Sequence, residues 1–494
     1  MKGWKRYLGG VFLIPLLLVI SACSDNTSDS SGDDEAFSFS IIAGLHTPEV
    51  PKEKVLEEIE AKTNVEIDIQ WIPASNYYDR LNSSFATNSL PDVINVGSQE
   101  LTQYRDAIED GQFWEIGPYL DEYENLQKLK DDIIENTKIN GKVYGLYNGI
   151  SLSRQGLIYR KDWADNLGLD KPTTTDEIME MARAFTEEEP DGNGKDDTFG
   201  LADRGDLIYG AFKTVSSWFG TPNYWGEKDG ELLPEFMFDE YMQTMDFFKE
   251  LRVNGYINQD FPVTSKTDQR EFITNGSAGM YIGAMGDVGS LYNDAVANDP
   301  NVEFDVHNYV EGPDGEYGVW SLPGYGSLML FPKSSVETED ELKKILSFFD
   351  KMMTPEVSNL ANWGIEGEHY EVVDDLAKTI VDSGVFDREV KPYAALLIGE
   401  PETRGSHEAL IDYDVKAKSE ELIKDNENYL INNPTEPLYS ETFVQDNSML
   451  QEIITDATYQ YMLDQIDKDD FESAVEDWRS QGGDDIIEEF NASE

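Results

Sequence analysis

The chain has 494 residues, with 98 acidic and 38 basic side chains and a formal net charge of −60. This charge would repel the phosphate backbone of DNA or RNA, so the composition excludes nucleic acid as a partner. Because 39% of the residues are hydrophobic and a single core rarely serves so long a chain, we expect two folded lobes.

The first 22 residues have the pattern of a secretory signal. Lys2, Lys5 and Arg6 form a basic start, and an apolar stretch follows at 11–20. That stretch has about ten residues, half of what a membrane-spanning helix needs. The Ile-Ser-Ala that precedes Cys23 resembles the bacterial lipobox, whose cysteine is diacylated after cleavage. A plain secretory signal with an incidental cysteine is the alternative.

The segment 23–36 is small, polar and acidic, which is typical of a flexible tether. Cys23 is the only cysteine, so the remaining chain has no disulfide, thiol nucleophile or cysteine metal site. No later stretch is long and apolar enough to span a bilayer. We therefore expect an exported protein that lies on the extracytoplasmic face of the cell membrane and is anchored there by its lipid alone. We favour a Gram-positive cell surface over a periplasmic inner-membrane anchor.

Strand and helix patterns alternate at the start of the folded part. Strands are predicted at 37–42, 65–71 and 91–96, and helices at 51–63 and from Ser75 onward. This order is typical of an open α/β sheet, whose ligands bind beyond the carboxyl ends of the strands. Here those ends are the turns after Ala43, Trp71 and Val96.

The same pattern returns later in the chain. Strands are predicted at 278–283 and 326–332, and a strand that runs into a helix is predicted within 156–163. Thr174 with Glu177 forms a capping box before an apolar helical stripe. From about Asp374 the pattern is mostly amphipathic helix.

Six sequence pieces together resemble one family, the large extracellular solute-binding lipoproteins of carbohydrate ABC transporters, family 1. The resemblance covers essentially the whole chain, and each piece alone is weak. The pieces are LPDVINVG (90–97), YRKDWADNLGLDKPTTTDEI (159–178), EPDGNGKDDTFGL (189–201), FGTPNYW (219–225), GSLMLFPKS (326–334) and WGIEGEHY (363–370).

The resemblance implies an α/β, periplasmic-binding-protein-like fold, with two α/β lobes, a hinge and a central ligand cleft. One lobe would combine 37–153 with 325–365, and the other 156–320 with 366–494. The chain would cross between them near 151–156, 321–326 and 364–368. Such a protein would be a monomer that captures an oligosaccharide, delivers it to the permease subunits of an ABC transporter and performs no chemistry.

The stretch EPDGNGKDDTFG (189–200) contains most of a calcium-binding loop, but its twelfth position is Gly200 instead of the bidentate acid of an EF-hand. Relatives that bind oligosaccharides carry such a loop as a structural site. The resemblance therefore implies a structural Ca²⁺ held by Glu189, Asp191, Asn193, the Lys195 carbonyl and Asp197. Glu189 stands where aspartate is usual. A solvated Asn-Gly turn without metal is the alternative.

Sugars present C–H faces and hydroxyl edges, so their sites combine aromatic rings with fixed polar groups. Large rings near the predicted strand ends, the Gly-Thr-Pro-Asn turn and the crossings are the candidates. The ligand-binding residues that we expect are Trp71, Tyr77, Trp218, Tyr224, Trp225, Trp320, Tyr325, Trp363 and Glu366. The bulk charge argues against a polyanionic ligand such as a uronate, although Arg154 or Arg160 near a crossing could reverse this.

Two other functions stay open. A binder of peptides or other small solutes would share the fold. A lipid-anchored glycoside hydrolase would need only two carboxylates. The four histidines show no metal-binding spacing, and neither a nucleophile elbow nor a phosphate loop is present. We therefore expect a protein that is not an enzyme.

Overall fold

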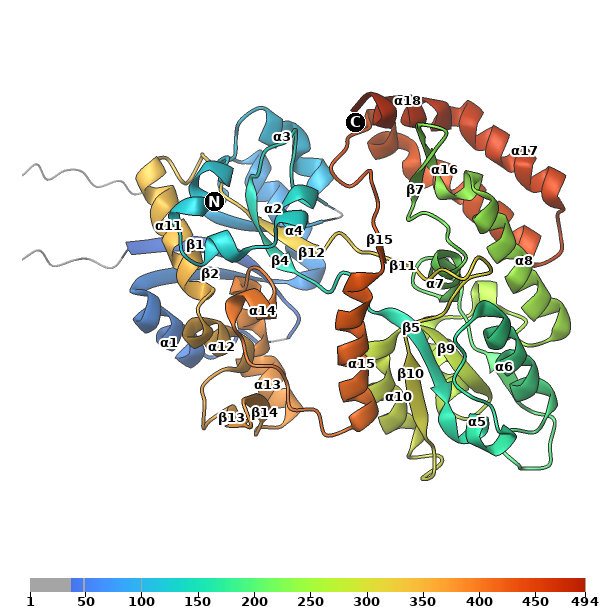
Figure 1. Ribbon diagram of the computed structural model, residues 1–494. Helices are drawn as coiled ribbons and strands as arrows, with labels where there is room; N and C mark the ends of the chain where they lie inside the picture. Colours follow the sequence, from blue (N-terminus) through green and yellow to red (C-terminus); the bar gives the residue numbers. More distant parts are fainter. Residues whose placement is uncertain (1–36, 48, 99, 494) are drawn as a thin grey trace, which may run out of the picture. The chain divides into compact units, whose positions relative to one another are not determined.

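The computed structural model describes residues 37–493 except 48 and 99. The expected signal, the tether and the acylated Cys23 lie outside the described residues. Two separate mixed sheets organise the described chain (Figure 1). We call the parts around them the first lobe and the second lobe. None of the helices within 37–493 has the length and apolar content that crossing a membrane requires.

The sheet of the first lobe has five strands in the order β2-β1-β3-β12-β4. Their bounds are β1 (Phe37–Leu45), β2 (Val65–Pro73), β3 (Val93–Gly97), β4 (Gly145–Gly149) and β12 (Tyr325–Leu330). β1 pairs in parallel with β2 and β3, whereas β12 runs antiparallel to its two neighbours. The carboxyl ends of β1 to β4 therefore meet at one edge, together with the beginning of β12.

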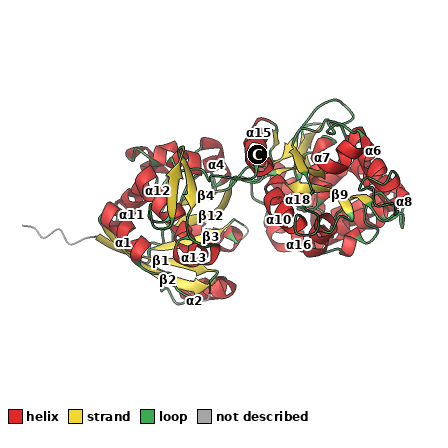
Figure 2. Cartoon of the chain, turned by 90° about the horizontal axis from the view of Figure 1, so that it is seen from below, coloured by secondary structure: helices red, strands yellow, loops and turns green. Residues whose placement is uncertain are grey.

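Helices lie on both sides of these strands (Figure 2). Phe39, Ile41 and Ile42 are all buried, as expected for a parallel strand covered on both faces. The elements of this lobe are α1 (Lys54–Thr63), α2 (Tyr77–Ala86), α3 (Arg105–Glu109), α4 (Asp131–Asn136), α11 (Glu339–Met352), α12 (Pro355–Trp363), β13 (Tyr370–Val373), β14 (Leu376–Thr379), α13 (Ser383–Glu389) and α14 (Pro401–Arg404).

The second lobe has a four-stranded sheet in the order β10-β5-β9-β6. Its strands are β5 (Gln155–Arg160), β6 (Phe199–Leu201), β9 (Ala278–Ala284) and β10 (Phe304–His307). β6 is parallel to β9, and β5 is antiparallel to both β9 and β10. The carboxyl ends of β6, β9 and β10 thus share one edge with the beginning of β5.

Helices and two short strand pairs surround this second sheet (Figure 1). The helices are α5 (Lys161–Leu167), α6 (Thr175–Glu187), α7 (Ala211–Trp218), α8 (Asp239–Asn254), α9 (Lys266–Thr274), α10 (Val288–Ala295), α15 (Asp414–Asp425), α16 (Glu441–Met462), α17 (Lys468–Trp478) and α18 (Asp484–Ser493). The short pairs are β7 (Trp225–Lys228) with β8 (Glu231–Pro234), and β11 (Val319–Trp320) with β15 (Leu430–Ile431).

Two predicted crossings coincide with the observed topology. The chain leaves the first sheet after β4 and enters the second at β5, and it returns between β11 and β12. The expected strands in 37–42, 65–71, 91–96, 278–283 and 326–332 are confirmed, and so is the strand that runs into a helix within 156–163. The cap of α6 is confirmed as well, because the Thr174 hydroxyl accepts a hydrogen bond from the Glu177 backbone N–H.

The third crossing, expected at 364–368, does not match the packing. Tyr393, Leu396 and Ile398 belong to the same hydrophobic core as β1 and β12. The Gly399 N–H donates to the Tyr147 carbonyl at 2.7 Å, so this segment extends the first sheet beyond β4. The polypeptide therefore stays with the first lobe up to α14 and joins the second at α15, which packs on β10. Helical periodicity alone could not reveal which sheet these residues cover.

Candidate ligand-binding site

Two expected ligand residues lie near the carboxyl edge of the first sheet. Trp71 stands on β2 opposite Ala43, and its half-buried ring packs edge-on against Tyr393 at 5.9 Å. Tyr77 is only 7% exposed, and its hydroxyl donates to the Asn95 carbonyl at 2.7 Å. Burial raises the pKa of Tyr77. Both rings thus support the edge of the sheet, and Tyr77 belongs to its core.

A polar pair at the end of β3 was not found from the sequence. The Tyr78 hydroxyl donates to a Glu100 carboxylate oxygen at 3.0 Å and accepts the Gly97 N–H at 3.1 Å. A Cβ atom on Gly97 would lie 2.3 Å from that carboxylate, so a larger residue would require the Glu100 side chain to move. Tyr325, at the same edge, is buried.

An aromatic group forms in the second lobe where the chain leaves β6 and enters α7. It consists of Tyr209, Tyr224 and Trp320 around the side chains of Lys213 and Glu235. The Tyr209 and Trp320 rings are 6.0 Å apart, and the Lys213 ammonium lies 3.6 Å from the centre of the Tyr224 ring. Trp320 donates its indole N–H to the Thr214 hydroxyl at 3.2 Å. Tyr209 is 39% exposed, so this group presents one large ring to solvent.

Lys213 and Glu235 form a buried ion pair beneath this aromatic group. Their side chains are 5% and 15% exposed, and the ammonium contacts a carboxylate oxygen of Glu235. The same oxygen accepts the Tyr224 backbone N–H at 3.0 Å, which holds Tyr224 in a left-handed conformation with φ of 59°. Burial lowers the pKa of Lys213, and Glu235 opposes that shift. The pair therefore fixes the position of the Tyr224 ring.

The stretch WFGTPNYW (218–225) was expected to expose large rings around its Gly-Thr-Pro-Asn turn, and this expectation is wrong for Trp218 and Trp225. Trp218 and Trp225 are 1% and 5% exposed. Trp225 packs edge-on against Phe490 at 4.9 Å. Trp218 lines a cavity of about 420 Å³ at the far end of α7, whereas Lys213 stands near the beginning of that helix. Both rings are needed to cover the hydrophobic core of the second lobe.

Trp363 and Glu366 stand apart from these groups. Trp363 ends α12, donates its indole N–H to the His407 carbonyl at 3.0 Å and packs near Phe386. Glu366 is exposed in the following turn. Trp363 and Glu366 were selected because a crossing was expected near them. No crossing occurs there, and their contact with a ligand stays a prediction.

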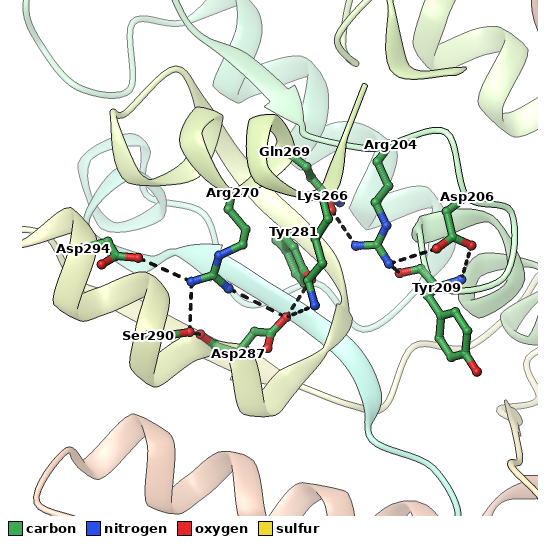
Figure 3. Close-up of polar contacts among 10 residues, drawn as sticks. All are labelled: Arg204, Asp206, Tyr209, Lys266, Gln269, Arg270, Tyr281, Asp287, Ser290 and Asp294. Atoms are coloured by element: carbon green, nitrogen blue, oxygen red, sulfur yellow. Dashed lines mark hydrogen bonds and ion pairs between the residues drawn. The ribbon is translucent and has the colours of Figure 1, made fainter. Parts of the chain in front are cut away.

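A cationic group lies at the carboxyl edge of the second sheet. Lys266 and Arg270, one helical turn apart on α9, both face Asp287, which follows β9 (Figure 3). Arg270 also donates to the Ser290 hydroxyl at 3.0 Å, and Tyr281 donates to Asp287 at 2.9 Å. The spacing of four between the two cations was a sequence signal for one helix face that our sequence analysis did not use.

Arg204 links the cationic and the aromatic groups. Its guanidinium donates to Gln269 on α9 at 2.8 Å and contacts the Tyr209 carbonyl, while Asp206 lies 3.4 Å away (Figure 3). The side chain is 7% exposed, so its charge is taken up by protein partners. Arg204 therefore holds α9 against the segment that carries Tyr209.

The two arginines that sequence analysis singled out differ in position. Arg154 is exposed, and its carbonyl accepts the Met285 N–H at 2.9 Å, which places it at the edge that bears the cationic group. Arg160 lies at the opposite end of β5, paired with Asp162 and 4.6 Å above Trp163. Of these two arginines, only Arg154 can add positive charge to the edge that bears Lys266 and Arg270.

The predicted calcium loop is exposed and brings three of its side chains together. The Asn193 amide donates to Asp191 at 2.6 Å and to Asp197 at 3.1 Å. Gly192 and Gly194 both have left-handed φ values, which the tight turn requires. Within 37–493, no three His, Cys, Asp or Glu side chains gather into a metal site. With Glu189, this loop would offer three carboxylates, an amide and a backbone carbonyl, a set of oxygens that suits Ca²⁺.

The fold has many solved counterparts. A human-milk-oligosaccharide-binding, ABC-transporter-associated solute-binding protein from Bifidobacterium longum infantis superimposes with a TM-score of 0.72 at 17% identity, over 93% of this chain and 98% of that one. The fold is therefore that of the periplasmic-binding-protein-like solute-binding proteins, as expected from the sequence.

Sequence comparisons then define the family. The model of the bacterial extracellular solute-binding proteins matches residues 46–358. The polygalacturonan/rhamnogalacturonan-binding protein YtcQ of Bacillus subtilis is 43% identical, over 97% of both chains. The lipoprotein LipO of the same organism is 34% identical, over 96% of this chain and 95% of that protein. The chain belongs to the family of bacterial extracellular solute-binding proteins. The family, YtcQ and the Bifidobacterium protein are described as binding proteins, not as enzymes.

Proposed function

We propose that this protein captures oligosaccharides released from pectic polysaccharides and delivers them to the permease of an ABC importer. The observation that carries the proposal is the likeness to YtcQ, which extends over 97% of both chains. The exposed Tyr209 ring beside the buried Lys213–Glu235 pair supports a sugar ligand, because sugars combine an apolar face with hydroxyl edges. Lipid attachment at Cys23 would keep the protein at the cell surface near its permease.

Isothermal titration calorimetry tests the ligand class. Purified protein is titrated with trigalacturonate, and with a neutral trisaccharide and a tripeptide as comparisons. We expect saturable binding of trigalacturonate. A sustained heat flow that scales with protein concentration would instead mean hydrolysis. Binding of the tripeptide without any binding of the sugars would support a peptide-binding protein.

We also propose a structural Ca²⁺ in the loop of Asp191, Asn193 and Asp197, with Glu189 and the Lys195 carbonyl as further oxygens. The support is that the Asn193 amide hydrogen-bonds both Asp191 and Asp197, which holds the two carboxylates close to each other. Because a bound ion stabilises only the folded state, chelation is expected to lower the melting temperature. An Asp191→Asn/Asp197→Asn variant should melt at the temperature of the chelated original protein, and neither calcium nor chelator should change that temperature. Equal melting curves of the original protein with and without chelator would contradict the proposal.

A further inference from the structure

Lys266 and Arg270 form a pair of cations whose donors point at one place. They stand on α9, and both face Asp287 at the carboxyl end of β9 (Figure 3). The side chains of Lys266 and Arg270 are 57% and 22% exposed. Ligands of open α/β sheets bind beyond the carboxyl ends of the strands, so a ligand at this edge would meet both cations.

Asp287, which both cations face, occupies few of their hydrogen-bond donors. The Lys266 ammonium is 3.6 Å and the nearest Arg270 nitrogen 3.9 Å from the Asp287 carboxylate, beyond the usual length of a hydrogen bond. That carboxylate oxygen already accepts the Tyr281 hydroxyl at 2.9 Å. Asp287 thus attracts both cations by charge, while the donors of the ammonium and of this guanidinium nitrogen remain available to a ligand.

The surroundings hold Arg270 in place. Its other terminal nitrogen donates to Ser290 and lies 3.4 Å from Asp294, both on α10. Arg204 fixes α9 through Gln269, which is fully buried. Binding a ligand would therefore order few additional side chains, which lowers the entropy cost of association.

We propose that Lys266 and Arg270 bind the carboxylate of a uronate residue in the captured oligosaccharide, with Arg154 adding positive charge at the same edge. This assignment rests on the proposed function, and it names the residues that would recognise the carboxylate of the ligand. An ammonium and a guanidinium are strong donors to a carboxylate. In a chain of net charge −60, cations on the ligand side of a sheet also offset the repulsion that an acidic sugar would otherwise meet.

The test compares two ligands with the same sugar backbone, one with three carboxylates and one with none. Trigalacturonate and its trimethyl ester are titrated into the original protein, Lys266→Gln and Arg270→Gln. Lys161→Gln is the matched control, because Lys161 is an exposed, ion-paired cation of the same lobe at the opposite end of β5. We expect each site variant to bind trigalacturonate about tenfold more weakly, whereas the control keeps its affinity. Binding of the trimethyl ester should change less than twofold in every variant.

Failure of this inference can be told apart from failure of the proposed function. If the original protein binds trigalacturonate and both site variants bind it equally well, the carboxylate site is wrong and the function stands. If the original protein binds no galacturonide, the proposed ligand class is wrong, and the carboxylate site with it. Melting curves recorded for each variant show that a lost affinity reflects the site and not unfolding.

Discussion

Replacing Glu235 with alanine is expected to lower the free energy of unfolding by about 3–5 kcal/mol. The substitution leaves the Lys213 ammonium buried without its counter-charge, and burial already lowers the pKa of this lysine. It also removes the acceptor of the Tyr224 backbone N–H. Chemical denaturation, followed by circular dichroism, measures the loss.

The matched control breaks an ion pair at the surface. In the Lys161–Asp165 pair both side chains are largely exposed, at 42% and 58%, so Asp165→Ala should cost less than about 1 kcal/mol. Adding Lys213→Met to Glu235→Ala should recover part of the lost stability, because an apolar side chain tolerates burial. If Glu235→Ala costs no more than Asp165→Ala, the buried pair does not stabilise the lobe as argued here.

Trp320→Ala is expected to cost about 3–5 kcal/mol of stability and to weaken oligosaccharide binding more than tenfold. The Trp320 ring is 1% exposed and supports Tyr209, which is the solvent-exposed ring of the aromatic group. Without this support Tyr209 would have to be ordered by the ligand itself, at a cost in entropy. Denaturation and calorimetry, both performed where the variant is folded, measure the two effects.

Trp163→Ala provides the comparison that separates stability from binding. Trp163 is fully buried in the same lobe and packs on Phe185, on helices α5 and α6 away from the aromatic group. We expect a similar loss of stability with an affinity close to the original. Tyr209→Ala should show the reverse pattern, a small change in stability and about tenfold weaker binding. Equal affinity losses in Trp163→Ala and Trp320→Ala would contradict a specific role for Trp320.

Much of the fold follows from local sequence patterns. The alternation Val65, Ile67, Ile69 gives β2, and the apolar run 278–283 gives β9, because such patterns depend on near neighbours alone. The third crossing was misplaced because Tyr393 packs in the same core as β1, and these residues lie more than 300 positions apart in the sequence. No periodicity reports a contact of that kind.

The candidate site was harder to predict than the fold. Tyr224 and Trp320 were selected as neighbours of the Gly-Thr-Pro-Asn turn and of a crossing, and their contact with a ligand stays a prediction. Tyr224 packs against Lys213, and Trp320 donates to the next residue, Thr214. Tyr209 and Lys213 were not selected, because the three-residue strand β6 that precedes their segment is too short to give a clear pattern. Trp218 was selected by its position in the turn, but burial depends on packing that spacing does not encode.

The return of residues 393–404 to the first sheet has a consequence for the order in which the chain folds. All four strands of the second sheet lie between 155 and 307, so they are synthesised as one continuous block. The first sheet begins earlier in the chain, but it is incomplete until β12 and the Tyr147–Glu400 hydrogen bond of 2.8 Å have formed. Domains usually fold from the N-terminus onward during synthesis. Here the sheet that starts first would be completed last, after about four fifths of the chain has emerged, and its early strands would depend on chaperones until then.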